Sequence, residues 1–374
     1  MTESSNVASL SSLTGHEFFM KRALELARNC SVLTSPNPKV GCVIVRNGQI
    51  LGEGFTQPAG KNHAEIEALN DVASRGENCR GATVYITLEP CAHFGRTPPC
   101  VDALIGAGVS CVVAALEDPN PLVAGKGFEK LGAAGIRVIR GVMAREAREM
   151  NRGFLSRIER GRPWVRMKVA ASLDGKTALS GGESQWITSE AAREDGHRWR
   201  MRADAVMTGI GTVMKDDPRL NVRLPDVVRQ PVRIVVDSQL KTPLDARVLR
   251  NGETWIFSAN ASPVKIDAMK QKGVQVFSAI NDTGRVDLAE MMKTLAEKEI
   301  NEIHVEAGAT LNGALVQAGF VDEILIYLAP CFLGSGRNML SLNQIDRLAD
   351  RIACDFHEIV PVGHDLRILA RLTD

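Results

Sequence analysis

Alternating strand and helix patterns run through most of this sequence and limit the folds open to it. Helical spacing of apolar residues, and short apolar runs between turn residues, predict a first series of elements. We expect helices at residues 16–30, 63–74, 100–107 and 126–134, and strands at 41–46, 49–52, 83–88, 110–115 and 136–139. Asn47-Gly48 predicts a type I′ turn between the first two strands, because both central residues of that turn need positive φ. Strands separated by such helices favour an α/β fold with a mostly parallel sheet.

The series begins again after a charged segment, residues 157–163, that contains Gly161 and Pro163 and predicts a domain boundary. The second series has expected strands at 164–170, 205–208, 232–236, 254–257, 303–306 and 323–328, and expected helices at 189–202, 287–298 and 310–318. Because a domain has about 100–200 residues, the 374 residues fit two α/β domains, which we place at 16–157 and 163–374. Residues 1–15 have neither the basic start nor the apolar core of a secretory signal, so we expect a disordered tail.

Composition and charge exclude several classes of protein. Hydrophobic residues make up 44% of the chain and charged residues 24%, as in ordinary globular proteins. Lys+Arg is 45 and Asp+Glu is 44, without the basic excess of a dedicated nucleic-acid binder. No apolar run approaches the roughly 18 residues that span a bilayer. Six of the eight cysteines fall in the first third of a chain that lacks an export signal, which favours metal or catalytic use in a reducing cytoplasm over disulfides.

One histidine and two cysteines in the first domain have the character of a zinc site. His63 lies at an expected helix start, Cys91 follows the strand at 83–88, and Cys100 starts the next helix. Nitrogen and thiolate ligands suit Zn²⁺, and three protein ligands leave a fourth position for water, which zinc acidifies towards hydroxide near neutral pH. Glu65 could then move a proton from that water to a leaving amine. H-x-E followed by P-C-x-x-C is the arrangement of zinc nucleobase deaminases.

The spacing of the two cysteines departs from that arrangement, because eight residues instead of two separate Cys91 from Cys100. Two alternatives therefore stay open on spacing alone. The residues could be unrelated core side chains, or they could form a structural zinc module with Cys79 or His93 as a fourth ligand. A substitution of Glu65 would distinguish a catalytic from a structural zinc site, because a structural site does not need an acid–base residue.

The residues inside the long spacer resemble a known family. The segment TLEPCAHFGRTPPC at 87–100 is similar to the deaminase motif of the bifunctional riboflavin-biosynthesis proteins, which have this longer spacer. Further blocks resemble the same family: PNPKVGCVIV at 36–45, DPNP at 118–121 followed by VAG at 123–125, ASLDGK at 171–176, GESQWIT at 182–188 and VEAG at 305–308. The resemblance covers nearly the whole chain from residue 16.

The resemblance implies a fold and two activities. The fold would be a cytidine-deaminase-like three-layer α/β/α domain followed by a dihydrofolate-reductase-like α/β domain. The first domain, a hydrolase, would deaminate 2,5-diamino-6-(5-phosphoribosylamino)pyrimidin-4-one to the uracil derivative, with His63, Cys91 and Cys100 on zinc and Glu65 as proton shuttle. The second, an oxidoreductase, would transfer a hydride from NADPH to C1′ of the ribosyl group and give the ribitylamino product.

For the first domain the resemblance implies three substrate contacts, each with a plainer alternative. Asn37 would hydrogen-bond the pyrimidine edge, because a carboxamide both donates and accepts. Alternatively, it only braces the turn between Pro36 and Pro38. His93 and Arg96 would meet the ribose phosphate, or they would belong to a solvated loop.

For the second domain the sequence itself gives only a weak signal. No G-x-G-x-x-G motif follows its first strand, so a Rossmann fingerprint is absent. Glycine-bearing turns at 208–212 and 306–313 let backbone N–H groups approach a phosphate, although such glycines usually serve the turn alone. The resemblance implies an NADPH site of Ala170, Trp186, Thr212, Asp216, Ser238, Gly308, Ala309, Thr310, Leu311, Asn312, Gly313 and Ala314. It implies substrate contacts from Lys168, Ser184, Arg200, Leu220, Arg223 and Glu306.

Several of these residues also have alternative roles. Trp186 would pack against the nicotinamide or be a core tryptophan. Arg200 and Arg223 suit a dianionic phosphate, because a guanidinium group offers a bidentate fork. Arg200 also belongs to a basic run that could be a solvated helix face. Lys168 and Glu306 are the hypotheses for proton handling.

The expected partners are a small phosphorylated pyrimidine and a second copy of the chain, since a homodimer is typical of the family. Neither nucleic acid nor membrane is expected. A nucleic-acid base deaminase with an appended binding domain is the competing function, and the balanced charge argues against it.

Overall fold

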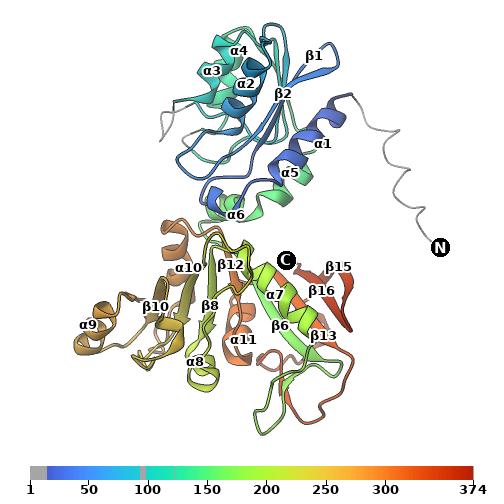
Figure 1. The fold of residues 1–374 in the computed structure, drawn as a ribbon. Helices are drawn as coiled ribbons and strands as arrows, with labels where there is room; N and C mark the ends of the chain where they lie inside the picture. The colour runs from blue at the N-terminus through green and yellow to red at the C-terminus, as the bar shows by residue number, and fades with distance from the viewer. Residues whose placement is uncertain (1–14, 93–97, 122, 374) are drawn as a thin grey trace, which may run out of the picture. The chain divides into compact units, whose positions relative to one another are not determined.

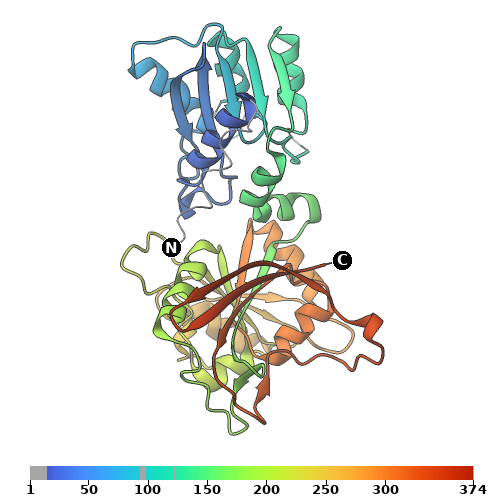
Figure 2. The ribbon, with the colours of Figure 1, turned by 90° about the vertical axis from the view of Figure 1, so that its right-hand side faces the viewer.

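The computed structural model describes residues 15–92, 98–121 and 123–373. The chain divides into two compact units, of which the first ends at Arg160 and the second begins at Gly161. Figures 1 and 2 show both units. No helix within the described residues is long and apolar enough to cross a membrane.

The first unit contains a five-stranded mixed sheet between two layers of helices. Its sheet has the order β2-β1-β3-β4-β5, in which β1 pairs antiparallel with both β2 and β3, while β3, β4 and β5 are parallel. Figure 1 shows α2, α3 and α4 on one face and α1 and α5 on the other. The elements are α1 (Gly15–Ala27), β1 (Gly41–Arg46), β2 (Gln49–Phe55), α2 (Ala64–Ser74), β3 (Thr83–Ile86), α3 (Cys100–Gly106), β4 (Cys111–Ala114), α4 (Lys126–Ala133), β5 (Arg137–Arg140), α5 (Ala144–Met150) and α6 (Arg152–Arg160).

Two glycines let helices pack directly on this sheet. A Cβ atom on Gly41 of β1 would lie 1.9 Å from the carbonyl oxygen of Ala23 in α1. A Cβ atom on Gly54 of β2 would lie 2.4 Å from the carbonyl oxygen of Ala64 in α2. Any larger residue would push α2 away from the sheet, and the start of α2 is where His63 and Glu65 lie.

The second unit contains a larger, mostly parallel sheet. Its order is β11-β10-β9-β8-β12-β6-β13-β16-β15, and only the β13–β16 and β16–β15 pairs are antiparallel. Its strands are β6 (Trp164–Ser172), β7 (Lys176–Ala178), β8 (Ala205–Gly209), β9 (Val232–Val236), β10 (Thr254–Ser258), β11 (Gln275–Ser278), β12 (Glu302–Val305), β13 (Glu323–Ala329), β14 (Arg337–Asn338), β15 (Cys354–Val362) and β16 (Asp365–Leu372). Its helices are α7 (Glu190–Arg202), α8 (Ile210–Asp216), α9 (Pro263–Gln271), α10 (Leu288–Glu297) and α11 (Ala309–Gln317). Short 3-10 turns lie at Val32–Thr34, Arg247–Leu249 and Leu348–Asp350.

The two faces of β6 differ in chemistry because side chains alternate along a strand. Val165, Met167 and Val169 join the apolar core shared with α10 and α11. Arg166 and Lys168 occupy the alternate positions, so β6 carries cations on the face opposite its apolar one.

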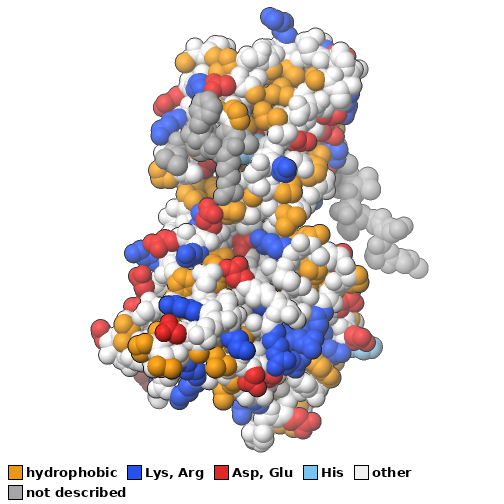
Figure 3. Space-filling model, turned by 60° about the vertical axis from the view of Figure 1, so that its left-hand side comes forward, with side chains coloured by type: hydrophobic (Ala, Val, Ile, Leu, Met, Phe, Trp, Pro, Cys, Tyr) orange, Lys and Arg blue, Asp and Glu red, His pale blue; other side chains and the backbone are white. Residues whose placement is uncertain are grey.

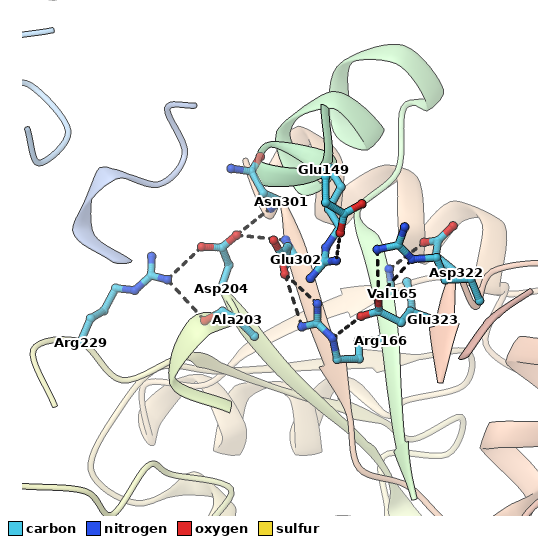
Figure 4. A network of polar contacts seen from close by, with 12 residues as sticks. Glu149, Val165, Arg166, Ala203, Asp204, Arg229, Asn301, Glu302, Asp322 and Glu323 are labelled. Atoms are coloured by element: carbon cyan, nitrogen blue, oxygen red, sulfur yellow. Dashed lines mark hydrogen bonds and ion pairs between the residues drawn. The ribbon is translucent and has the colours of Figure 1, made fainter. Parts of the chain in front are cut away.

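Arg166 is the centre of a buried ionic network on this face (Figure 4). Its Nε donates to Glu323 Oε1 at 2.6 Å, and Glu302 accepts at 3.4 Å. The side chains of Arg166 and Glu323 are 1% and 0% exposed. The Arg166 guanidinium also stacks 4.4 Å from the ring centroid of Trp199 in α7. Charged groups without water must pair with one another, and this network does so between β6, β12, β13 and α7.

The expected α/β alternation is confirmed in both units, with three corrections. The sheet of the first unit is mixed, because the hairpin predicted from Asn47-Gly48 forms its antiparallel edge. Residues 157–160, expected in a charged linker, form the end of α6. The prediction missed α5, α6, α8, α9, β7, β11 and β14–β16, most of which are short or exposed.

Candidate functional site

His63, Cys91 and Cys100 come together in the first unit. His63 is the N-cap residue of α2, Cys91 follows β3, and Cys100 opens α3. Cys100 Sγ lies 3.4 Å and Cys91 Sγ 3.7 Å from His63 Nδ1, and one potential ligand atom from each residue lies within 4.8 Å of the others. Hydrogen bonds from Cys100 and His63 lower the pKa of Cys91 below its ordinary value, so Cys91 is the readier thiolate of the two cysteines.

This donor set fits zinc. One imidazole nitrogen and two sulfur atoms are borderline-soft ligands of the kind that Zn²⁺ takes. Two residues were alternatives for a fourth zinc ligand. Cys79 is one of them, and it is not part of the cluster of potential ligands found among the described residues. His93, the other alternative, lies outside the described residues.

Glu65 lies beside this group in the first turn of α2. Its side chain is buried, and burial, reinforced by the charge of Cys91, raises its pKa to about 7. A carboxyl group with a pKa near 7 can both take up and release a proton at neutral pH, which is what general acid–base catalysis needs.

The three predicted substrate contacts of the first unit are not all described. Asn37 lies in the turn before β1, where its backbone N–H donates to Thr34 O at 3.0 Å. This bond agrees with a turn-bracing role, and no recorded contact among the described residues joins Asn37 to His63. His93 and Arg96 lie outside the described residues.

The second unit contains a cavity of about 1510 Å³ at the carboxyl ends of β8, β9 and β12. Ligands of open α/β sheets bind in this position. The cavity exceeds the roughly 300–1,000 Å³ of a typical small-ligand pocket and has room for a dinucleotide. Gly308 caps α11 without a side-chain hydrogen bond, so backbone N–H groups of the first turn of α11 remain available at its wall.

Most, but not all, of the predicted cofactor residues line this cavity. Those that do are Thr212, Asp216, Ser238, Gly308, Ala309, Thr310, Leu311 and Ala314. Ala170, Trp186, Asn312 and Gly313 are not among the lining residues. Asn312 is buried and donates to Ala307 O, and a Cβ on Gly313 would meet the backbone of Ser341, so both serve packing. Trp186 is 67% exposed and stacks on Arg193, so it is not a core tryptophan.

Of the predicted substrate residues, Ser184 and Glu306 line the cavity, and Arg200 and Lys168 lie next to Glu306. Arg200 pairs with Glu306, so it does not belong to a merely solvated helix face. Arg200 and Lys168 oppose the effect of burial and keep the pKa of Glu306 well below its usual range. Burial lowers the pKa of Lys168, against the attraction of Glu306. Glu306 therefore supplies a carboxylate, and Lys168 beside it supplies an ammonium group that gives up its proton more readily than usual.

The remaining two substrate residues differ in exposure. Leu220 is buried in an apolar cluster and has a positive φ of 52°. Arg223 is exposed, and partial desolvation first, and then the charges of Arg200, Arg219 and Arg247, lower its pKa. Lys and Arg side chains also gather visibly on one face of the second unit (Figure 3). The positive charges of Arg200, Arg219 and Arg247 around Arg223 favour a phosphate ligand there.

Two histidines that the sequence analysis did not single out lie near Glu306. His304 is fully buried, and its Nε2 lies 3.5 Å from Glu306 Oε1. Burial first, and then the charge of Arg200, lower the pKa of His197 to about 4. Spacing offered a signal for both, because His304 precedes Glu306 by two strand positions and His197 precedes Arg200 by three helix positions.

Comparison with protein-family models assigns both units. The model for the cytidine and deoxycytidylate deaminase zinc-binding region matches residues 13–116, which include His63, Cys91 and Cys100. The model for the RibD C-terminal domain matches residues 163–368. The first unit thus has a cytidine-deaminase-like fold and the second the dihydrofolate-reductase-like fold of RibD reductase domains, as expected.

Known proteins resemble the chain over nearly its full length. The riboflavin biosynthesis protein RibD of Escherichia coli is 47% identical over 364 residues, which cover 94% of this chain and 97% of that protein. The structure of Acinetobacter baumannii RibD is 41% identical with a TM-score of 0.88, and covers 96% of this chain and 99% of that one. A Thermotoga maritima structure described as a diaminohydroxyphosphoribosylaminopyrimidine deaminase/5-amino-6-(5-phosphoribosylamino)uracil reductase is 33% identical with a TM-score of 0.83, at the same coverage. The chain therefore belongs to the RibD family, bifunctional enzymes of riboflavin biosynthesis that join a zinc-binding deaminase domain to an NADPH-dependent reductase domain.

Proposed function

We propose that the first unit deaminates 2,5-diamino-6-(5-phosphoribosylamino)pyrimidin-4-one and that the second unit reduces the ribosyl group of the resulting uracil derivative. The observation that carries the proposal is the meeting of His63, Cys91 and Cys100 beside the buried Glu65. The activities in the name of the Thermotoga maritima structure support the choice of substrate.

In the first unit, His63, Cys91 and Cys100 would hold zinc, which when bound supplies a Lewis acid that acidifies water near neutral pH. Glu65 takes the proton of the attacking water and passes it to the departing amino group, which leaves as ammonia. The pKa of about 7 allows this carboxyl group to perform both transfers. Because Glu65 is buried, its carboxyl group is also shielded from exchange with bulk water during the transfer.

In the second unit, NADPH when bound supplies a hydride to C1′ of the sugar. One proton must balance that hydride, and Lys168 is the proposed donor because burial weakens its hold on its proton. Glu306 holds Lys168 and Arg200 at the cavity through its negative charge. Arg200 and Arg223 would bind the 5′-phosphate, for which positive charge and guanidinium forks are suited.

We also propose that the protein is a homodimer in the cytoplasm. All eight cysteines are free, which agrees with a reducing compartment. Size-exclusion chromatography with light scattering tests the dimer directly, and a monomeric mass would contradict it.

The test of the function follows ammonia release and NADPH oxidation together on the zinc-loaded protein, with the diaminopyrimidine ribosyl phosphate as substrate. We expect ammonia without NADPH, and NADPH oxidation only after deamination. Ammonia release with no NADPH oxidation would leave the first assignment standing and refute the second. Absence of both ammonia release and NADPH oxidation would refute the proposed substrate assignment.

A further inference from the structure

The cavity of the second unit extends well away from Glu306. Its wall continues along the segment after β9, with Ser238 and Lys241, and the segment after β11, with Arg285 and Asp287. In the sheet order, β11 lies four positions from β12, which is roughly 19 Å at about 4.8 Å per strand. If the nicotinamide ring lies by Glu306, as the proposed function requires, the adenosine end of the cofactor lies towards β9 and β11.

The carboxylates at this far end are already engaged. Asp237 is 1% exposed, and its Oδ2 accepts from the N–H and the hydroxyl group of Thr242 at 2.7 and 2.8 Å. Asp287 caps α10, where Oδ1 accepts from the N–H groups of Ala289 and Glu290 at 2.8 and 3.1 Å. A carboxylate that receives a free ribose diol is the usual device of NAD enzymes. Each of these aspartates has one carboxylate oxygen bonded within the protein, and the other oxygen of Asp237, Oδ1, is buried without a hydrogen-bond partner.

Two cations at the same end have the opposite character. Lys241 and Arg285 are exposed, both line the cavity, and neither side chain has a recorded ion pair or hydrogen bond with the described residues. The backbone beneath them is held in place. Val286 N donates to Ser238 Oγ at 3.1 Å, and Asn281 Oδ1 accepts from Arg285 N at 2.9 Å. The two segments are therefore joined, and each presents an uncommitted cation at the adenosine end.

A second pair of cations, Lys215 and Arg337, lines a different part of the cavity. Lys215 Nζ donates to Gly182 O, and Arg337 lies close to the same glycine. Gly182 is near Ser184 in the loop after β7, a strand that pairs with β14 outside the nine-stranded sheet. Lys215 and Arg337 are therefore associated with the loop after β7, whereas Lys241 and Arg285 belong to the segments after β9 and β11.

We propose that Lys241 and Arg285 bind the 2′-phosphate of NADPH and thereby make the second unit select NADPH over NADH. A ribose 2′-phosphate is a dianion, and basic side chains at the adenosine ribose distinguish it from a free hydroxyl group. The assignment rests on the proposed function, since it concerns the far end of the same cofactor cavity.

The test measures binding, independently of turnover, by calorimetric titration of the zinc-loaded full chain. NADPH and NADH are compared, together with 2′,5′-ADP and 5′-AMP, which lack the nicotinamide and differ from each other in the 2′-phosphate. Lys241→Ala and Arg285→Ala should each weaken NADPH and 2′,5′-ADP about ten-fold, as expected for one exposed charge-assisted contact. NADH and 5′-AMP should bind as before. Lys241→Arg and Arg285→Lys should retain most of the affinity.

Control variants show whether a negative result refutes the 2′-phosphate assignment alone or the proposed reductase function as well. Lys272→Ala removes an exposed lysine that does not line the cavity, and should leave all four affinities unchanged. Full NADPH affinity in both alanine variants would overturn the assignment, as would loss of NADPH selectivity in Lys215→Ala or Arg337→Ala instead. If the unaltered protein bound neither dinucleotide, the proposed reductase function itself would be refuted, and the 2′-phosphate assignment with it.

Discussion

Arg200 and Glu306 meet so that two guanidinium nitrogens share one carboxylate oxygen. Nε and Nη2 of Arg200 lie 2.8 and 2.7 Å from Glu306 Oε1, while Nη1 donates to the carbonyl oxygen of Asn221. All three nitrogens of the guanidinium group are therefore in use, and α7 is tied to the end of β12 at the cavity wall. A lysine has one nitrogen and cannot make this set of contacts.

Arg200→Lys should lower kcat/KM for reduction by about 10- to 100-fold, because one or two charge-assisted hydrogen bonds worth about 1.5–3 kcal/mol are lost. Ammonia release from the first unit should not change. Arg198→Lys on the same helix is the matched control, since Arg198 forms an exposed pair with Glu194. Equal effects of the two variants on reduction would mean that the shared contact with Glu306 is not what matters.

Glu65→Gln should abolish most deamination and nothing else. Removal of a general acid–base group costs about 10²- to 10⁴-fold in rate, whereas glutamine keeps the size of the side chain and the packing of α2. Zinc content by elemental analysis and NADPH oxidation with pre-deaminated substrate should both stay normal. Glu67→Gln, in the first turn of the same helix, should retain deamination. Full deaminase activity of Glu65→Gln would contradict the role of Glu65 as the proton shuttle.

Cys100→Ser should reduce the zinc content and deamination together, because a serine hydroxyl group is a poor zinc ligand at neutral pH. Reduction by the second unit should persist in the same preparation. Cys79→Ser tests the fourth-ligand alternative, and we expect it to keep its zinc because Cys79 lies outside the ligand group. Zinc loss in Cys79→Ser at an intact fold would contradict a three-ligand site.

The sequence predicted those elements of the fold that turn residues or short apolar runs specify. The hairpin at Asn47-Gly48 and the strand β9 (Val232–Val236) appear as expected, because turn chemistry and an apolar run specify them without distant partners. The edge strand β15 (Cys354–Val362) has mostly exposed residues, so it shows no apolar run to detect. Its pairing with β16 depends on backbone hydrogen bonds and on the ion pair between Glu358 and Arg367, neither of which leaves a local pattern.

Some residues of the candidate sites could likewise be predicted from local sequence signals, and others could not. His63, Cys91 and Cys100 could be found in the sequence because zinc dictates ligand types and the family dictates their spacing. Lys241 and Arg285 could not, because the strand β11 (Gln275–Ser278) was not expected, and the cavity wall forms only when β9 and β11 lie in one sheet. The burial of His304 likewise depends on residues from distant segments, among them Arg166 and Arg200, which no local pattern reveals.

Arg166→Met should lower the free energy of unfolding of the second unit by about 3–5 kcal/mol, because it leaves Glu323 buried with a weaker partner. Arg371, 3.3 Å from Glu323, keeps the loss towards the lower end of that range. The four tryptophans, at 164, 186, 199 and 255, all lie in the second unit, so urea denaturation followed by tryptophan fluorescence reports that unit alone. Arg198→Met, which breaks an exposed pair, should cost less than about 1 kcal/mol. Similar losses in both variants would contradict the importance of burial.

His304→Asn should flatten the acid side of the stability profile. Burial lowers the pKa of His304 to about 3 from its ordinary 6.5, so between these values the unfolded chain binds a proton that the folded chain does not. The free energy of unfolding of the second unit should therefore fall as pH falls below about 6.5, by up to about 1.4 kcal/mol per pH unit from this group. Denaturation followed by tryptophan fluorescence at pH 7, 6, 5 and 4 measures the slope. His304→Asn should have a shallower slope than the unaltered protein, and His364→Asn, at an exposed histidine, should keep the original one. An unchanged slope in His304→Asn would show that other groups carry the acid sensitivity, His197 first among them, because its pKa is also lowered from 6.5, to about 4.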